Sequence, residues 1–147
     1  MLLINGDSLK TLITQRKPMI MVDILYDALE LDAYTGLKIT SDNMFCNEGF
    51  FTEPGLVEHI AQSVAAFVGY KALLTNKHIP LCFLAEVKKC SIRFLPRAGD
   101  SLLPRIQLLS ETLAVSLFDA ETSTSSHVVA QCKMKIFVKK TEQDLQD

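Results

Sequence analysis

The stretch EPGLVEHIAQSVAAFVGY, residues 53–70, decides the fold. With about 100° between successive helical residues, its apolar side chains fill more than half of a helix circumference. Such a helix must be buried by other parts of the chain. Glu58, His59, Gln62 and Ser63 nevertheless gather in one polar sector near its start, so the stretch combines ionisable groups with a hydrophobic setting.

The bulk composition narrows the class of protein. The 147 residues are 48% hydrophobic and 22% charged, which is typical of one globular domain spanning residues 1–147 with a frayed tail at 139–147. A net charge of -2 supplies no general attraction to nucleic acid or to anionic lipid. The longest apolar run falls well short of the ~20 residues that cross a membrane.

The cysteines point to a reducing compartment. Cys46, Cys82, Cys90 and Cys132 are scattered without a C-x-x-C pair, and no secretory signal opens the chain. We therefore expect a cytoplasmic protein with reduced cysteines in its core. No ligand pair has the spacing of a zinc site, so no metal is predicted.

Strands are predicted on both sides of the helix. Alternation of apolar and polar residues predicts a hairpin from residues 19–31 and 33–40, then a loop at 41–49. Thr52 and Pro54 suit the start of the helix, which we expect to reach about Leu74. A short amphipathic helix capped by Asp7 is predicted at 7–14, and the later strands at 81–94, 102–110, 113–119 and 127–138.

This order predicts an α+β fold. Two strands, one long helix and about four strands require a curled antiparallel sheet wrapped around the helix, if the broad apolar arc is to be covered. One sheet around one helix leaves an open flank. That flank favours a dimer.

Five local motifs occur in a fixed order. LITQRKPMIMVD (residues 12–23) is followed by NEGFF (47–51), by Pro54-Gly55 at the helix start, by EHIAQ (58–62) and by FLAEVKKCSIRFLPRAGDSL (83–102). Together they resemble the hotdog-fold family of 3-hydroxyacyl-acyl-carrier-protein dehydratases, over nearly the whole chain.

The resemblance implies a fold, an activity and partners. Family members are homodimers or higher even oligomers, and they dehydrate a 3-hydroxyacyl thioester on acyl carrier protein, or on coenzyme A, in fatty-acid or polyene-type biosynthesis. They use no metal or organic cofactor. An acyl-chain tunnel lies at the dimer interface of such proteins. Phe50, Phe51 and Phe67 are expected either to line that tunnel or to belong to the core, and the sequence does not divide the two roles.

The resemblance also implies roles for individual residues. Glu58 would be the catalytic acid or base, supported by Gln62 and by His59, and the Gly55 amide would hold the thioester oxygen. By charge alone, the basic residues Lys88, Lys89, Arg93 and Arg97 are either a solvated strand face and turn or a surface that attracts the acidic carrier protein or its phosphopantetheine phosphate.

One departure from the family leaves alternatives open. The family's presumed base is a histidine in the loop before the helix, and residues 52–57 contain none. Neighbouring helix residues diverge by about 100°, so His59 is not expected to replace it on the same substrate atom. Either the site has been rebuilt around Glu58 and a partner's group, or this chain is a silent subunit that pairs with an active dehydratase. A hotdog acyl thioesterase, in which Glu58 activates water, is the rival enzyme.

Overall fold

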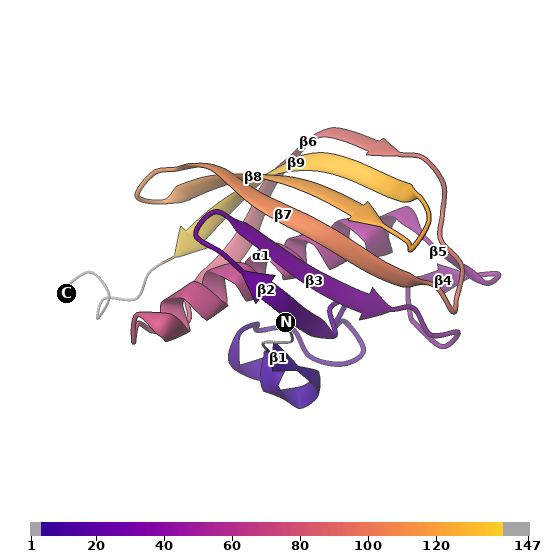
Figure 1. Ribbon diagram of the computed structural model, residues 1–147, viewed down its shortest axis with the longest axis horizontal. Coiled ribbons are helices and arrows are strands. Elements are labelled where there is room, and N and C mark those ends of the chain that lie inside the picture. Colours follow the sequence, from indigo (N-terminus) through magenta and orange to yellow (C-terminus); the bar gives the residue numbers. More distant parts are fainter. Residues whose placement is uncertain (1–3, 140–147) are drawn as a thin grey trace.

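A curled sheet wraps one long helix in the computed structural model, which describes residues 4–139 (Figure 1). All strand pairs are antiparallel, and the seven-stranded sheet has the order β1-β2-β3-β7-β8-β9-β6. The predicted α+β hotdog architecture is therefore confirmed. The elements are β1 (Ile4–Asn5), η1 (Gly6–Thr11), β2 (Ile24–Ala28), β3 (Asp32–Lys38), β4 (Cys46–Asn47), β5 (Phe50–Phe51), α1 (Glu53–Leu74), β6 (Leu81–Ile92), β7 (Ser101–Glu111), β8 (Val115–Ser123) and β9 (Val128–Lys139).

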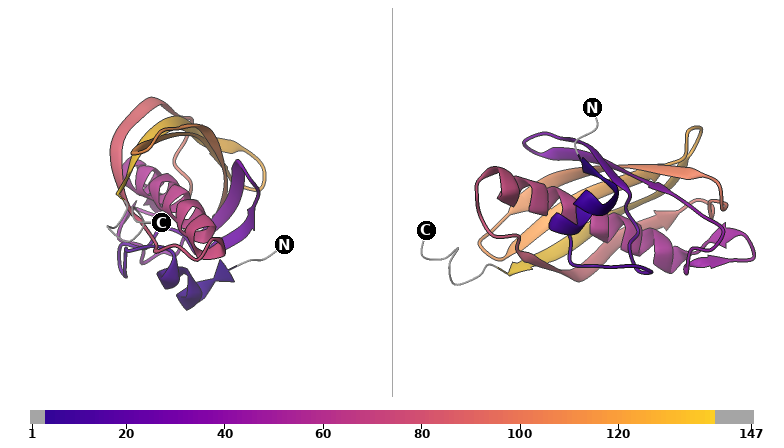
Figure 2. Two further views of the ribbon diagram at one scale, coloured as in Figure 1. Left: turned by 90° about the vertical axis from the view of Figure 1, so that its left-hand side faces the viewer. Right: turned by 90° about the horizontal axis from the view of Figure 1, so that it is seen from below.

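The sheet forms a half-pipe whose axis follows α1. Viewed along the helix, the strands arch over one side of α1 while η1 and the N-terminal segment lie against the other side (Figure 2). No helix among residues 4–139 is long and apolar enough to cross a membrane. Of the predicted tail, Lys139 ends β9, and residues 140–147 lie outside the described part of the chain.

The long helix begins and ends where the sequence predicts. Thr52 is the N-cap residue and Pro54 lies in the first turn. The Thr52 hydroxyl does not cap a helix amide, however, because it donates to the Phe45 carbonyl at 2.6 Å. The helix stops at Leu74, and Asn76 then adopts a left-handed conformation with φ 57°, which is a common way of ending a helix.

The first helix differs from its prediction. It is a 3-10 helix, η1, that starts at Gly6 and follows Asn5, so Asp7 is not its cap. Leu12, the residue that follows it, packs directly on α1, since a Cβ built on Gly69 would lie 2.5 Å from the Leu12 carbonyl oxygen. Gly69 thus lets two backbone segments approach each other closely.

Two strands, β2 and β8, differ clearly in length from their predictions. β2 begins at Ile24, five residues later than predicted, because residues 19–21 bond to helix side chains and not to a strand. β8 continues to Ser123, four residues beyond its predicted end. Thr122 belongs to this strand and points into the core, where a polar residue was not expected.

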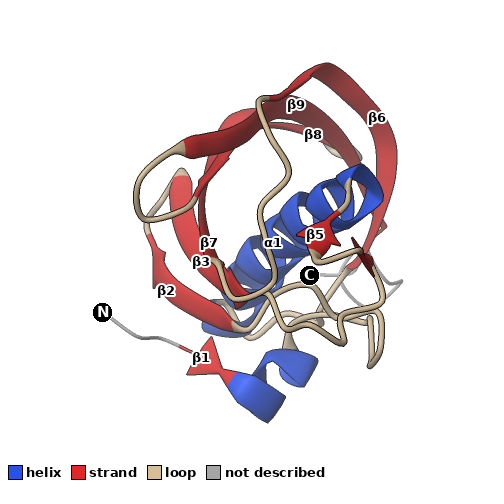
Figure 3. Ribbon diagram, turned by 90° about the vertical axis from the view of Figure 1, so that its right-hand side faces the viewer, coloured by secondary structure: helices blue, strands red, loops and turns tan. Residues whose placement is uncertain are grey.

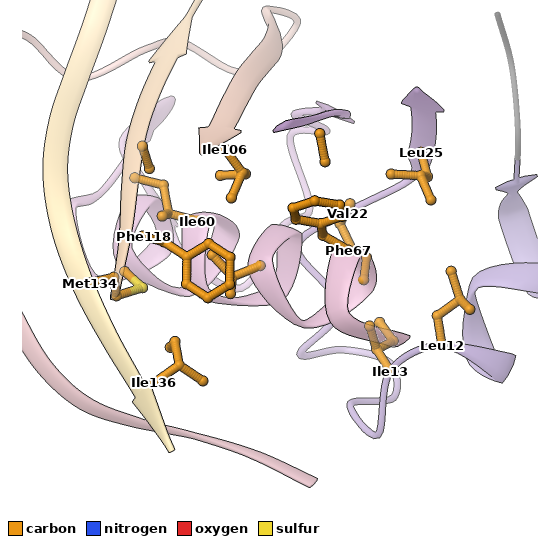
Figure 4. Packing of buried hydrophobic residues seen from close by; sticks show 14 of the residues in the cluster. Leu12, Ile13, Val22, Leu25, Ile60, Phe67, Ile106, Phe118, Met134 and Ile136 are labelled. Atoms are coloured by element: carbon orange, nitrogen blue, oxygen red, sulfur yellow. The ribbon is translucent and has the colours of Figure 1, made fainter. Parts of the chain in front are cut away.

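Two hydrophobic clusters fill the half-pipe. The larger one lies between α1 and the sheet and includes Phe67 and Phe118, whose rings meet edge to face at 6.4 Å (Figure 4). The smaller one surrounds Phe51 at the start of α1. Cys132 is buried as predicted, but Cys90 is exposed because it lies on the outermost strand, β6.

One flank of the half-pipe is open. Within the described residues β6 pairs only with β9, and its other edge has no strand beside it (Figure 3). Leu81, Phe83 and Leu84 on this strand are 43 to 51% exposed. A long edge strand with exposed apolar side chains is a site for pairing with another chain.

Candidate functional site

Glu58 and Gln62 form the centre of the site. They lie one helical turn apart, and the Gln62 amide nitrogen donates to Glu58 Oε1 at 2.8 Å. Glu58 is half-buried, whereas Gln62 is fully buried. The Glu58 carboxylate is thus accessible to solvent, while the buried Gln62 side chain fixes its position.

Gln62 is itself fixed by the N-terminal segment. Its oxygen accepts from the Met21 amide at 2.6 Å, and its nitrogen also donates to the Met19 carbonyl at 2.7 Å. Both hydrogens of the carboxamide are therefore used, and its orientation is defined by three partners. This arrangement orients Glu58 through a segment about 40 residues away in sequence.

His59 has a different environment. It is fully buried, Nδ1 lies 2.8 Å from the Met21 carbonyl oxygen, and Nε2 lies 3.3 Å from the Thr122 hydroxyl. Because a carbonyl only accepts, Nδ1 carries the proton and Nε2 accepts from Thr122. Burial lowers the pKa of His59 to about 4, although the bond to Met21 opposes that shift. The ring is neutral near pH 7 and packs inside the fold.

A second polar contact supports the same turn of helix. Thr35 Oγ1 donates to Ser63 Oγ at 2.7 Å, and Ser63 Oγ donates to the His59 carbonyl at 2.8 Å. Both hydroxyl groups are buried. The sequence did not reveal the parts played by Thr35 and Thr122. The polar sector of the helix was the signal that the sequence offered. Its buried polar groups needed hydrogen-bond partners, so polar side chains that point inward from the sheet could have been expected.

Gly55 lies in the first turn of α1 and is buried. A Cβ at this position would lie 2.7 Å from the Phe45 Cβ and from the edge of the Phe51 ring. Packing therefore explains the absence of a side chain. The Gly55 amide is among the first amides of the helix, which have no partner within the helix and can bind a negatively charged oxygen.

The three phenylalanines predicted to line a tunnel lie in different places. Phe51 is fully buried in the smaller core cluster beside Gly55. Phe50 is 37% exposed and lies under the Arg97 guanidinium, 5.1 Å from its ring centroid. Phe67 lies nine residues beyond Glu58, in the larger cluster. Within this chain the structure does not bring them into one cavity.

The predicted basic group follows the edge strand. Lys89 lies in an irregular part of β6 with a left-handed φ of 49°, and Arg93 and Arg97 follow the end of that strand. All three side chains are exposed. Since Phe50 also pairs with Arg97 through an isolated bridge, this basic surface continues to the start of α1.

The other two histidines lie outside the Glu58–Gln62 pair. His78 follows the far end of α1, and Leu74 alone is already about 24 Å of helical rise beyond Glu58. His127 is in the β8–β9 turn, where it contacts Ser126 and stacks edge-on against Phe94. Among residues 4–139, the hydrogen bonds of the His59 and His127 rings go to Met21, Thr122 and Ser126.

Comparison with known proteins identifies the family of this chain. The profile of ApeP-like dehydratases matches residues 7–147. The chain belongs to the ApeP-like dehydratase family. It is also 25% identical, over 137 residues covering 89% of each chain, to the 3-hydroxyacyl-[acyl-carrier-protein] dehydratase FabZ of Vibrio cholerae. The predicted dehydratase resemblance is confirmed at the level of the family.

Solved structures share the fold of this ApeP-like chain. A chain of the dehydratase heterocomplex ApeI:P from Xenorhabdus doucetiae superposes with a TM-score of 0.84 at 14% identity, covering 94% of this chain and 95% of that one. A hypothetical thioesterase with coenzyme A from Streptococcus pneumoniae gives 0.64 at 9% identity, covering 80% and 85%. At these identities the likenesses show the hotdog fold alone.

Proposed function

We propose that this ApeP-like protein is a dehydratase subunit for 3-hydroxyacyl thioesters on acyl carrier protein, in fatty-acid or polyene-type biosynthesis. One observation carries the proposal: in a dehydratase-family chain, the Glu58 carboxylate is held by buried Gln62 at an accessible position of the central helix. The four free cysteines are consistent with work in the cytoplasm, where thiols stay reduced.

In the proposed reaction, Glu58 acts as the acid that protonates the leaving hydroxyl group. A base takes the proton from the carbon next to the thioester, the bond from the third carbon to oxygen breaks, and Glu58 donates the proton that releases water. The electron pair of the broken C–H bond becomes the new C=C bond of a trans-2-enoyl thioester. The Gly55 amide would stabilise the negative thioester oxygen during this step.

The base is proposed to come from a second chain. His59 is unsuited to the role because it is buried, neutral and bonded through both nitrogens. The open flank along β6 is suited to pairing, either with a second copy or with a homologous dehydratase. The relative from Xenorhabdus doucetiae, described as a dehydratase heterocomplex, supports the heteromeric choice. In such a pair the homologue would contribute the loop histidine that this chain lacks.

The carrier protein is proposed to approach along the basic surface. Lys89, Arg93 and Arg97 are exposed and extend from β6 to the start of α1. An acidic carrier and a phosphate group would both be attracted to these cations. Coenzyme A would present the same phosphopantetheine arm without the protein contacts.

The test uses the chain alone and together with a homologous dehydratase from the same host. Each preparation is incubated with 3-hydroxyacyl and 2-enoyl thioesters of carrier protein and of coenzyme A. We expect interconversion by the paired chains and little by this chain alone. Glu58→Gln should reduce the rate of the pair at least tenfold. Glu53→Gln, at an exposed glutamate in the first turn of the same helix, is the matched control.

Other outcomes separate the alternatives. Release of free thiol, lost in Glu58→Gln, would replace the dehydratase proposal with the thioesterase, and the hypothetical thioesterase from Streptococcus pneumoniae shares this fold. Full activity of the pair in the presence of Glu58→Gln would assign this chain the part of a silent partner. Failure of the two chains to copurify, with full activity of this chain alone, would refute the need for a second protein.

A further inference from the structure

A pocket lies at the opposite end of α1 from Glu58. It has a volume of about 240 Å³ and is lined by the last turns of α1, the following loop, and the ends of β7, β8 and β9. Phe67, its nearest helical lining residue, is nine positions from Glu58, which is about 14 Å of helical rise. The pocket is therefore separate from the Glu58–Gln62 pair.

The lining of the pocket is mostly apolar, although Ser116 and His78 also belong to it. Phe67 and Phe118 form one wall, and Leu108 and Val138 add side chains from β7 and β9. A dry cavity of about 150 Å³ with such a lining is large enough to bind benzene. This pocket is larger, so a straight hydrocarbon chain on the order of eight carbons is a reasonable occupant.

The rim of the pocket carries charge. Lys71 and Lys77 supply two ammonium groups, and Glu111 supplies one carboxylate. Lys71 lies over the Phe67 ring at 4.5 Å and donates to the Glu30 carbonyl, and within the described part of the chain its ammonium group has no carboxylate partner. None of the four salt bridges among residues 4–139 includes any of these three rim groups. The rim therefore favours an anion.

We infer that this pocket binds a straight-chain carboxylate of about eight carbons, with the hydrocarbon chain against Phe67 and Phe118 and the carboxylate at Lys71 and Lys77. The hydroxyl groups of Thr75 and Thr112 do not provide the head-group contact, because both already donate to backbone carbonyls. The inference is independent of the proposed dehydratase activity. It concerns a second ligand site, remote from the Glu58 carboxylate.

The test compares three probes of equal length and different charge. Octanoate, 1-octanol and octylammonium are titrated into the full chain by isothermal calorimetry. We expect octanoate to bind saturably, one per chain, and at least tenfold more tightly than octylammonium. Equal affinity for the two ions, or no saturable binding of octanoate, would overturn the inference.

Variants locate the two ends of the ligand. Lys77→Met keeps the length of the side chain and removes its charge, so it should weaken octanoate at least fivefold and leave octanol within twofold. Glu111→Gln should tighten octanoate. Lys10→Met, at an exposed lysine on η1, is the control and should change neither affinity. Unchanged octanoate affinity in Lys77→Met would refute the head-group assignment.

A variant in which a larger side chain fills the pocket should bind the octyl probes more weakly. Val68→Phe adds a ring at a helix position that lines the pocket and is partly exposed. It should weaken octanoate and octanol alike, at least tenfold. If circular dichroism shows that this variant does not fold, Ala72→Leu provides a smaller change at a neighbouring lining position. Undiminished binding in a folded variant would place the ligand elsewhere and refute the inference.

Discussion

His59 Nδ1 lies 2.8 Å from the carbonyl oxygen of Met21, so a histidine in the second turn of the central helix serves as a buried donor to a segment 38 residues earlier. Its other nitrogen accepts from Thr122 on β8. One side chain thus connects three parts of the fold, and it can do so only while it is neutral.

The stability of the protein should therefore depend on pH through His59. Its pKa is lowered from 6.5 to about 4, so between these values the unfolded chain binds a proton that the folded chain does not. The contribution of His59 to the free energy of unfolding is complete above pH 6.5 and is lost as pH falls toward 4. It falls by about 1.4 kcal/mol per pH unit, or on the order of 3 kcal/mol in all.

Urea unfolding near pH 7 and near pH 5 measures this loss. His59→Gln lacks the titrating group and should show a smaller pH dependence than the original protein. The control is His127→Gln, in an exposed turn, and it should retain the original dependence. Equal dependence in all three proteins would show that His59 does not titrate as described.

Gln62→Ala should destabilise the protein and disorder the site together. The substitution leaves the buried Met21 amide and the Met19 carbonyl without their partner, at a cost of about 2 kcal/mol or more. Glu58→Gln should change the free energy of unfolding by less than about 1 kcal/mol, since its carboxylate is half-buried and makes one such bond. Urea unfolding of both variants compares the contribution of Gln62 to the free energy of unfolding with that of Glu58, the residue that Gln62 orients. Equal losses would contradict this division.

Gly69→Ala should also destabilise the protein, although alanine is the better helix former by about 1 kcal/mol. The added Cβ would lie 2.5 Å from the Leu12 carbonyl oxygen, and backbone atoms cannot move aside as a side chain can. We expect a net loss of about 1 to 3 kcal/mol in urea unfolding. A gain in stability would mean that η1 can move away from the helix at little cost.

Leu84→Asp tests the open flank. Leu84 is 43% exposed on β6, so the charge should cost the isolated chain little. It should, however, at least halve the fraction of associated chains seen by analytical ultracentrifugation, because it places a carboxylate at the free strand edge. Leu113→Asp is the control, at a side chain that is 90% exposed in the β7–β8 turn. Similar association in both variants would show that β6 is not the interface.

Much of the fold followed from local sequence signals. Thr52 and Pro54 predicted where α1 begins, and alternating residues predicted the hairpin and most of the later strands. These features depend on neighbours within a few positions. The width of the apolar arc further predicted that a sheet must curl around the helix.

The same local sequence signals predicted less of the candidate site. A helical wheel brings Glu58 and Gln62 to one face, and that pair was predicted and is present. The environment of His59 depends instead on the Met21 carbonyl and on Thr122, which are 38 and 63 residues away. No periodicity within the helix contains that information. The long-range bonds of residues 19–21 also delay the start of β2, whereas β8 is longer than predicted because its last residues pair with β7 and β9.

The bonding of residues 19–21 to the helix has a consequence for how this sequence can vary. Because Gln62 and His59 replace a neighbouring strand for these residues, the N-terminal segment cannot change its backbone path without a matching change at both helix positions. In a library that randomised residues 19–21, position 19 should accept many side chains because Met19 is exposed and the helix recognises only its main chain, whereas position 21 should stay apolar because the Met21 side chain is buried in the smaller cluster. In a library randomised at positions 59 and 62, few variants should fold, and the residues found at the two positions should depend on each other.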